Sequence, residues 1–151
     1  CLQEVLKENI PDLIAKTDYQ VYFIPMTKVK EPTIWAKNAK GEAGIAILTK
    51  IKTIRNGFKY YFGGNGEMPT FNIGDFRNVW RVLAWVEIEK ENHKYVIANT
   101  HFTWTPRGKS NPRQEKDIQS LLIALRQLDD FILCGDFNAP RGGEIWGKLA
   151  E

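Results

Sequence analysis

One feature constrains the fold of this chain more than any other: strand-like segments predominate before residue 105, and one amphipathic helix follows them. The clearest strand covers 79–89, where apolar and polar side chains alternate with a period of two. The polar turn EKENH separates it from a returning strand over 95–102, so the two segments predict a hairpin. Further extended segments are expected over 2–5, 20–25 and 44–49, and either a strand or a hairpin over 51–62.

The helix is predicted by its start signal and by its apolar stripe. Asn111 is a suitable N-cap, and Pro112 occupies the first helical position. The apolar residues behind them recur at helical spacing and form one stripe: Ile118, Leu121, Leu122, Leu125 and Leu128. A buried strand is expected over 131–134, a helical turn or short helix over 7–16, and a short helical stretch over 144–150. Strands followed by covering helices indicate a layered α/β fold.

Size and charge set loose bounds on function. The chain has 151 residues and a net charge of +3, which allows one domain with a real core and permits a polyanionic partner without requiring one. No apolar run reaches membrane-spanning length, so no transmembrane segment is expected, and we expect a cytoplasmic protein if no targeting signal has been lost before Cys1. Cys1 and Cys134 lie in apolar runs and are predicted to be buried free thiols. The sequence carries no signature of an oligomeric state.

The stretch FILCGDFN, residues 131–138, ends a buried strand with polar residues. Asp136 and Asn138 are two apart, so on an extended chain their side chains project together from the edge of the sheet. A carboxylate and an amide placed together can bind a metal ion or activate a water. Asp and Asn are also common turn formers, and on this segment alone an ordinary turn is the favoured interpretation.

Other polar residues also stand at the ends of elements. Glu4 follows the extended segment CLQ, and His101 ends the returning strand with Asn99 on the same face. Arg113 lies in the first turn of the long helix. Each signal is weak alone, because a histidine at a strand end is more often structural or solvated than catalytic.

Five short motifs occur in one order along the chain: LQE at 2–4, GIAIL at 44–48, NTH at 99–101, Arg-Gln at 113–114 and GDFN at 135–138. This ordered set resembles the endonuclease/exonuclease/phosphatase family, the metal-dependent phosphoesterases related to deoxyribonuclease I. The resemblance covers essentially the whole chain and outweighs the turn-only interpretation of GDFN. It implies a four-layer α/β sandwich, in which two packed, mainly antiparallel β-sheets are flanked by helices.

The resemblance also implies roles for single residues. Glu4 matches the family's metal-binding glutamate, and Asp136 matches the aspartate that orients or deprotonates the attacking water. Asn138 matches the asparagine that helps to hold that water and a phosphate oxygen, and His101 matches a position that contacts the scissile phosphate. Mg²⁺ is the expected ion, because a hard cation held by carboxylates and waters offsets the charge of a phosphodiester, and Mn²⁺ would also accept oxygen ligands.

Three more residues are expected near the substrate. Asn99 shares the face of His101, and Trp104 either stacks on a base or caps the core. Arg113 and the basic residues of RGKS at 107–110 either steer an anionic substrate or belong to a solvated loop. RGKS itself lacks the glycine spacing of a P-loop, which argues against nucleotide binding of that kind.

Two elements of the family pattern are not found in the sequence. The early Asn would precede Cys1, and the closing Ser-Asp-His would follow Glu151. We therefore expect 1–151 to be a single incomplete domain, a truncated fragment that lacks its first strand and its C-terminal part. Outside the site, Arg81 is expected in a surface salt bridge and 63–76 in an ordinary surface loop.

The leading expectation is a metal-dependent phosphoesterase that hydrolyses phosphodiester bonds by direct attack of an activated water. Nucleic acid is the favoured substrate class, and a phosphodiesterase or phosphatase acting on lipid headgroups is the nearest enzymatic alternative. A non-catalytic binding module with the same fold is the alternative from a different class. The joint presence of Glu4, His101, Asp136 and Asn138 argues against it, since a binding surface has no need of all four.

Overall fold

Two β-sheets form the centre of the computed structural model, which describes residues 1–30, 40–71 and 78–150. The first sheet has three antiparallel strands in the order β1 (Leu2–Leu6), β3 (Gly41–Thr49) and β2 (Gln20–Val29). The second has four strands in the order β4 (Thr53–Phe62), β5 (Arg81–Lys90), β6 (His93–His101) and β7 (Phe131–Asp136). Its neighbours are antiparallel except for β6 and β7, which are parallel.

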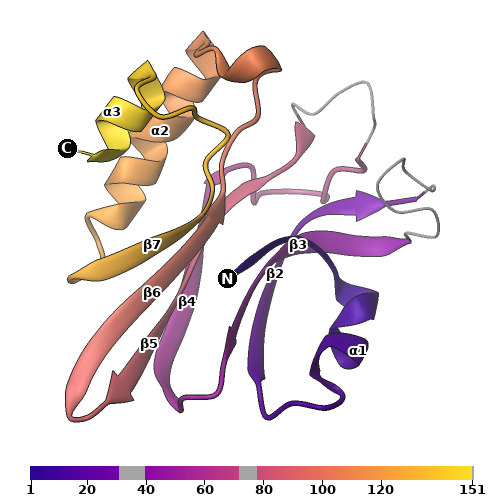
Figure 1. The fold of residues 1–151 in the computed structure, drawn as a ribbon. Coiled ribbons are helices and arrows are strands. Elements are labelled where there is room, and N and C mark those ends of the chain that lie inside the picture. Colours follow the sequence, from indigo (N-terminus) through magenta and orange to yellow (C-terminus); the bar gives the residue numbers. More distant parts are fainter. Residues whose placement is uncertain (31–39, 72–77, 151) are drawn as a thin grey trace.

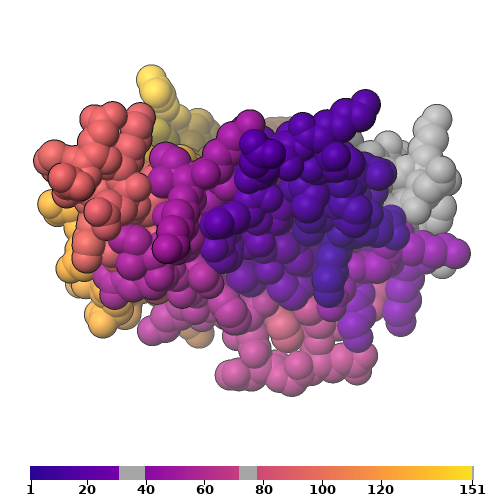
Figure 2. Space-filling view, turned by 90° about the horizontal axis from the view of Figure 1, so that it is seen from below, coloured from indigo at the N-terminus to yellow at the C-terminus, as the bar shows by residue number. Residues whose placement is uncertain are grey.

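Helices cover the outer faces of both sheets (Figure 1). The helices α2 (Pro112–Leu125) and α3 (Glu144–Ala150) lie on the four-stranded sheet, and α1 (Ile10–Ile14) lies beside the three-stranded one. Seen from below, the indigo and purple segments of the first sheet lie directly against the magenta segments of the second (Figure 2). This arrangement confirms the four-layer α/β sandwich. None of the described helices combines the length and the apolar character needed to cross a membrane.

Several elements are longer or less regular than the sequence predicts. β2 continues beyond the expected 20–25 to Val29, because a register shift between Pro25 and Thr27 lets the pairing with β3 resume after the proline. The helical turn or short helix expected over 7–16 is found as a 3₁₀ turn, Lys7–Asn9, followed by the short α1. Of the loop expected over 63–76, residues 72–77 lie outside the described residues.

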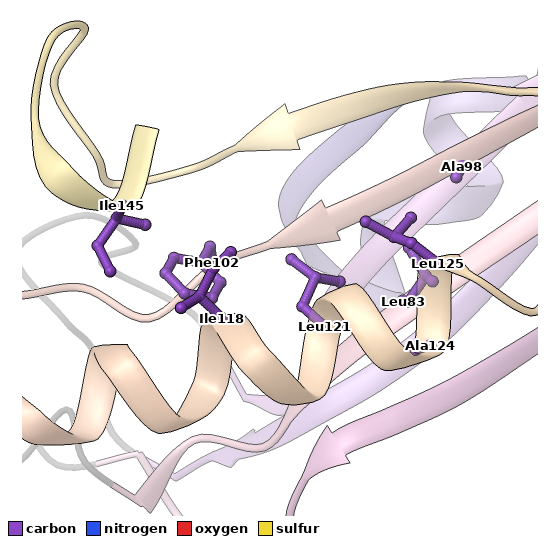
Figure 3. Packing of buried hydrophobic residues seen from close by; sticks show 8 residues of the cluster. All are labelled: Leu83, Ala98, Phe102, Ile118, Leu121, Ala124, Leu125 and Ile145. Carbon is purple, nitrogen blue, oxygen red and sulfur yellow. The ribbon is translucent and has the colours of Figure 1, made fainter. Parts of the chain in front are cut away.

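Two apolar cores lie on the two sides of the four-stranded sheet. α2 begins at the predicted cap, where Asn111 Oδ1 accepts a hydrogen bond from the Gln114 amide at 2.8 Å. Its apolar stripe packs on the sheet and on α3 to form the core in Figure 3: Leu83, Ala98, Phe102, Ile118, Leu121, Ala124, Leu125 and Ile145. The second core fills the space between the sheets: Met26, Ile45, Ile47, Val82, Ala84, Val86 and Ile88.

Two expectations about burial are wrong. Arg81, expected at the surface, is only 4 % exposed, because one face of β5 packs on the other sheet and the opposite face packs under α2. Its Nη1 donates a hydrogen bond to the carbonyl oxygen of His101 at 3.0 Å. Cys1 is exposed just before β1, and Cys134 is half-buried, so the two free thiols are not both core residues.

Candidate active site

The candidate site lies at the ends of two parallel strands. β6 and β7 are joined through α2, and a crossover of this kind returns the chain in the same direction. The two strands therefore end at the same edge of the sheet, where the register pairs His101 with Asp136. Gly135 permits this close approach: its φ is 152°, and a Cβ there would lie 2.1 Å from the carbonyl oxygen of Thr100.

Hydrogen bonds fix the GDFN segment against the end of β6. Asp136 Oδ1 accepts from the Asn138 amide at 2.9 Å, and Asn138 Nδ2 donates to the Phe102 carbonyl oxygen at 3.0 Å. The Phe102 amide donates in turn to the Asp136 carbonyl oxygen at 2.8 Å. Asn138 has a φ of 47°, a left-handed conformation that asparagine adopts more readily than most residues. The segment is thus a turn, and this turn orients the Asp136 carboxylate.

Gln114 supports the same two segments, and sequence reasoning gave it no role of its own. Its side chain is fully buried at the start of α2. Its Nε2 donates a hydrogen bond to the Thr103 carbonyl oxygen at 2.8 Å and lies 3.4 Å from the Asn138 carbonyl oxygen. Gln114 therefore joins the segment that follows β6 to the segment that follows β7. One signal identifies it: Gln114 precedes Ile118 by one helical repeat of four and so lies on the apolar face of α2.

His101 is largely buried beside Asp136. Its Nε2 lies 3.8 Å from Asp136 Oδ2, which is longer than a hydrogen bond. The pKa of His101 is lowered from 6.5 to about 4, first by burial and second by the charge of Arg81, while Asp136 opposes the shift. The imidazole is therefore neutral near pH 7.

Asn99, expected beside the substrate, has protein partners on all sides. It is fully buried between the sheets. Its Nδ2 donates to the carbonyl oxygens of Leu2 and Ala46, each at 3.0 Å, and its Oδ1 accepts from Gln3 Nε2 at 2.7 Å. Asn99 therefore joins β1 to β6 across the interface of the sheets and acts as a positioning residue.

Glu4 is placed by the same contacts. It follows Gln3 in β1, and its side chain is exposed. β1 is irregular here: its register with β3 shifts between Leu2 and Val5, and Glu4 has a φ of 56°. Gln3, the residue before Glu4, lines the same groove as Asp136, whereas Glu4 itself is not among the lining residues.

An open groove of about 680 Å³ runs past Asp136 and Asn138. Trp104, expected either to stack on a base or to cap the core, lines this groove and is 45 % exposed. Arg107, from the RGKS segment, lines it as well and lies in the 3₁₀ turn Pro106–Gly108.

Arg113 does not line the groove. Its Nε donates to Asp117 Oδ2 at 2.6 Å, and its guanidinium lies 3.3 Å from the centre of the Phe62 ring. Asp117 is buried and also accepts from Thr103 Oγ1 at 2.5 Å. The structure thus gives Arg113 a part in holding α2 on the sheet, because its position four residues before Asp117 favours an ion pair along the helix.

The side chains available at this edge suit a hard divalent cation. Within residues 1–30, 40–71 and 78–150, no three His, Cys, Asp or Glu side chains converge into a cage that would enclose an ion by itself. Asp136 is an exposed carboxylate in the groove, and Glu4 is an exposed carboxylate next to Gln3, which lines it. Mg²⁺ is commonly held by one or two carboxylates together with several waters. Carboxylate oxygens of this kind suit such an ion, and Glu4 as its ligand stays a prediction.

A comparison with protein families gives a match over residues 1–148, to the model described as the endonuclease/exonuclease/phosphatase family. The chain belongs to this family. The resemblance carried by the LQE, NTH and GDFN motifs is thereby confirmed. Enzymes of the endonuclease/exonuclease/phosphatase family generally use divalent metal ions. A comparison with curated proteins found no match.

Solved structures of the endonuclease/exonuclease/phosphatase fold are similar to this chain. The human Nocturnin catalytic domain with bound sulfate is 21% identical, with a TM-score of 0.65 over 100% of this chain and 55% of that chain. The Bacteroides thetaiotaomicron mannosyl-6-phosphatase Bt3783 is 15% identical, with a TM-score of 0.66 over 97% and 53%. ANGEL2, a 2′,3′-cyclic phosphatase in complex with adenosine-2′,3′-vanadate, is 17% identical, with a TM-score of 0.63 over 99% and 42%. These likenesses show the fold, and this chain spans about half the length of the first two.

Proposed function

We propose that this chain carries catalytic residues of a metal-dependent phosphoesterase that hydrolyses phosphodiester bonds by direct attack of water. One observation carries the proposal: Asp136 and Asn138 line one groove together with Gln3, the neighbour of Glu4, and His101 is paired with Asp136 in the register of the sheet. Membership of the family supports the reaction class.

Asp136 is the residue that we assign to activation of the water. Its Oδ1 accepts a hydrogen bond from the Asn138 amide, which orients the carboxylate. Its side chain is 53% exposed, so a water can reach it. A carboxylate within hydrogen-bond distance of a water can take its proton as the water attacks phosphorus. Asn138 Nδ2 uses one N–H on Phe102, and the second N–H of an amide can hold the water or a phosphate oxygen.

His101 is assigned to the phosphate. A neutral imidazole can donate one hydrogen bond to a phosphoryl oxygen, and it does so without adding a positive charge that would repel a nearby divalent ion. Arg81 holds the backbone of His101 from behind, so the imidazole is presented from a fixed position. Preorganised donors of this kind stabilise charge that develops in the transition state.

Glu4 would hold the divalent ion, Mg²⁺ or Mn²⁺, which when bound offsets the negative charge of the phosphodiester and of the attacking oxygen. The exposed position of Glu4 leaves room for water beside the carboxylate. Hydrogen bonds from Gln3 to Asn99 and from Asn99 to Leu2 tie β1, the strand that carries Glu4, to β6.

Nucleic acid is the substrate class that we favour. The net charge of +3 suits a polyanion, and the ANGEL2 structure holds an adenosine derivative. The mannosyl-6-phosphatase shows that the same fold also occurs in an enzyme named for a sugar phosphate. The test of function therefore also includes a lipid-headgroup substrate.

The test measures hydrolysis of bis(p-nitrophenyl) phosphate, a single-stranded oligonucleotide and sphingomyelin, by the chain alone and by the longest natural protein that contains it. We expect turnover that EDTA abolishes and Mg²⁺ or Mn²⁺ restores, with the oligonucleotide cleaved faster than sphingomyelin. Activity confined to the longer protein would support the expectation that 1–151 is an incomplete domain. Preferential cleavage of sphingomyelin would replace nucleic acid by a lipid headgroup, and substrate binding without turnover in either form would identify a non-catalytic module.

A further inference from the structure

The groove continues beyond the residues assigned to catalysis, and this continuation is aromatic and basic. Trp104 and Arg107 contribute to it from the segment that follows β6. Phe137 contributes from the GDFN turn, and Trp146 contributes from α3. Trp104 lines the groove and is 45 % exposed, so a ligand in the groove can reach it.

Trp146 packs against other side chains of the protein. The Phe137 ring meets it at an interplanar angle of 80°, with the ring centres 6.2 Å apart. The neighbouring residue, Ile145, is buried in the core beneath α2, which anchors α3 (Figure 3). An aromatic wall that is already held by packing loses little conformational freedom on binding.

The charges beside these rings favour an anionic ligand. Arg107 lines the groove, and the Arg141 guanidinium lies 5.6 Å from the centre of the Trp146 ring. Arg141 thus already provides the cation that the π face of Trp146 attracts. A quaternary ammonium group such as choline would meet two positive charges here, whereas a planar ring joined to a phosphate would be complementary to both the rings and the charges.

A buried hydroxyl at the same groove lacks a partner. Thr105 lines the groove and is 2 % exposed, and its Oγ1 has no hydrogen-bond partner among the residues that the structure describes. Buried hydroxyls are normally paired with protein or with ordered water. A polar ligand atom, or a water held beneath the ligand, would give the Thr105 hydroxyl a hydrogen-bond partner.

We propose that Trp104, Arg107 and Trp146 form a subsite for a nucleobase and its phosphate. The inference rests on the proposed function, because the subsite would hold one nucleotide beside the bond whose attacking water Asp136 activates. Stacking on aromatic rings is tolerant of base identity. The subsite would therefore distinguish nucleotides from sugar phosphates and lipid headgroups without selecting one base.

Calorimetric titration with adenosine 5′-monophosphate, ribose 5-phosphate and phosphocholine tests the subsite directly. We expect adenosine 5′-monophosphate to bind about tenfold more tightly than ribose 5-phosphate, since the two share the phosphate and differ by the stacked base. Phosphocholine should bind no better than ribose 5-phosphate. Equal binding of the first two ligands, or tighter binding of phosphocholine, would overturn the inference.

Substitutions then assign the effect to the rings. Trp104→Leu and Trp146→Leu should each reduce the preference for adenosine 5′-monophosphate over ribose 5-phosphate at least threefold. Trp104→Phe should keep most of this preference. Arg107→Gln should weaken the binding of adenosine 5′-monophosphate and of ribose 5-phosphate by the same factor. Tyr95→Leu, an exposed aromatic at the opposite end of β6, is the matched control and should change neither. Since Trp146 packs on Phe137, the folded state of each variant is checked by thermal unfolding, and an unchanged preference in folded Trp104→Leu would count against the subsite.

Failure of this inference and failure of the proposed function give different results. Equal affinity for adenosine 5′-monophosphate and ribose 5-phosphate, together with metal-dependent turnover of bis(p-nitrophenyl) phosphate, would reject the proposed subsite and support the proposed phosphoesterase activity. Base-selective binding without turnover in any form of the protein rejects the phosphoesterase and leaves the subsite.

Discussion

The two halves of the candidate site are held in different ways. Asp136 and Asn138 belong to a hydrogen-bonded turn that Gln114 supports from a buried position in α2, and His101 stands on a strand backed by the buried Arg81. Glu4 stands on β1 at the edge of the three-stranded sheet, where the register shifts and the side chain is exposed.

This difference matches the two tasks that we assign. Groups that move a proton or bind a developing charge act best from fixed positions, because misplacement by about 1 Å can cost on the order of a hundredfold in rate. A ligand of Mg²⁺ needs access to water instead, because this ion keeps several waters when it binds. The fixed half is therefore expected to be sensitive to changes in packing, and the exposed half to changes in charge.

The largest effect should follow from changing the carboxylate of the fixed half. Asp136→Asn keeps an oxygen that can accept the Asn138 amide but removes the base, so we expect the rate to fall about 100-fold to 10,000-fold without loss of the fold. Hydrolysis of bis(p-nitrophenyl) phosphate at saturating Mg²⁺ measures it. Asp130→Asn, an exposed position just before β7, is the control. Full activity of Asp136→Asn would remove Asp136 from the mechanism.

The next effect concerns the connection between the halves. Asn99→Ala removes three hydrogen bonds from a fully buried site and leaves two carbonyl oxygens and Gln3 without their partner, so we expect the free energy of unfolding to fall by about 3 kcal/mol. Urea unfolding monitored by circular dichroism measures it. Asn56→Ala, on an exposed position of β4, should change stability by less than about 0.5 kcal/mol. A comparably small change for Asn99→Ala would show that β1 is held by other contacts.

A smaller effect should appear on acidification. The pKa of His101 in the folded protein is about 4, below its ordinary value of 6.5, so the folded state favours the neutral imidazole. Its contribution to stability is complete above about pH 6.5 and is lost as the pH falls towards 4, by up to about 3 kcal/mol. Comparing the free energy of unfolding of the natural protein and His101→Gln between pH 7 and pH 4.5 isolates this contribution. If the two lose stability in parallel, the proposed burial of a neutral His101 is wrong.

The smallest effect is expected in the exposed half. Glu4→Gln should leave thermal stability almost unchanged, because the side chain is exposed, but should raise the Mg²⁺ concentration needed for half-maximal activity about tenfold, because a charged ligand is lost. Glu89→Gln, an exposed glutamate near the end of β5, is the matched control. An unchanged metal requirement for Glu4→Gln would contradict the assignment of Glu4 as the ligand.

Sequence reasoning succeeded where one strand or one helix decides the outcome. The N-cap at Asn111 and the GDFN turn are local, and each is found at the predicted position. Alternation along β5 failed for Arg81, because alternation assumes that one face of a strand meets water, whereas here α2 returns to cover that face. Glu87 shows the same effect: it is buried and paired with Arg55 and Lys94.

The candidate site was only partly accessible to the same reasoning. Arg113 stands at a helix start, where a role in anion binding is reasonable, but its neighbour one turn later is a buried carboxylate that takes the guanidinium. Asn99 was expected beside the substrate, yet its partners are Leu2 and Ala46, which lie 97 and 53 residues away in sequence, in strands whose packing no local pattern records. Contacts of that kind become visible only when both sheets are present.

The absence of a side chain at Gly135 has a consequence for how relatives of this chain are recognised. Any larger residue would meet the carbonyl oxygen of Thr100 and force β6 and β7 apart, although Gly135 itself takes no part in the proposed chemistry. A homologue that retains every acid, amide and imidazole but replaces this glycine would possess the full inventory of reactive groups in the wrong alignment. A search for the reactive residues alone would classify such a protein as an enzyme. Only the distance between its strands would show that these residues are misaligned.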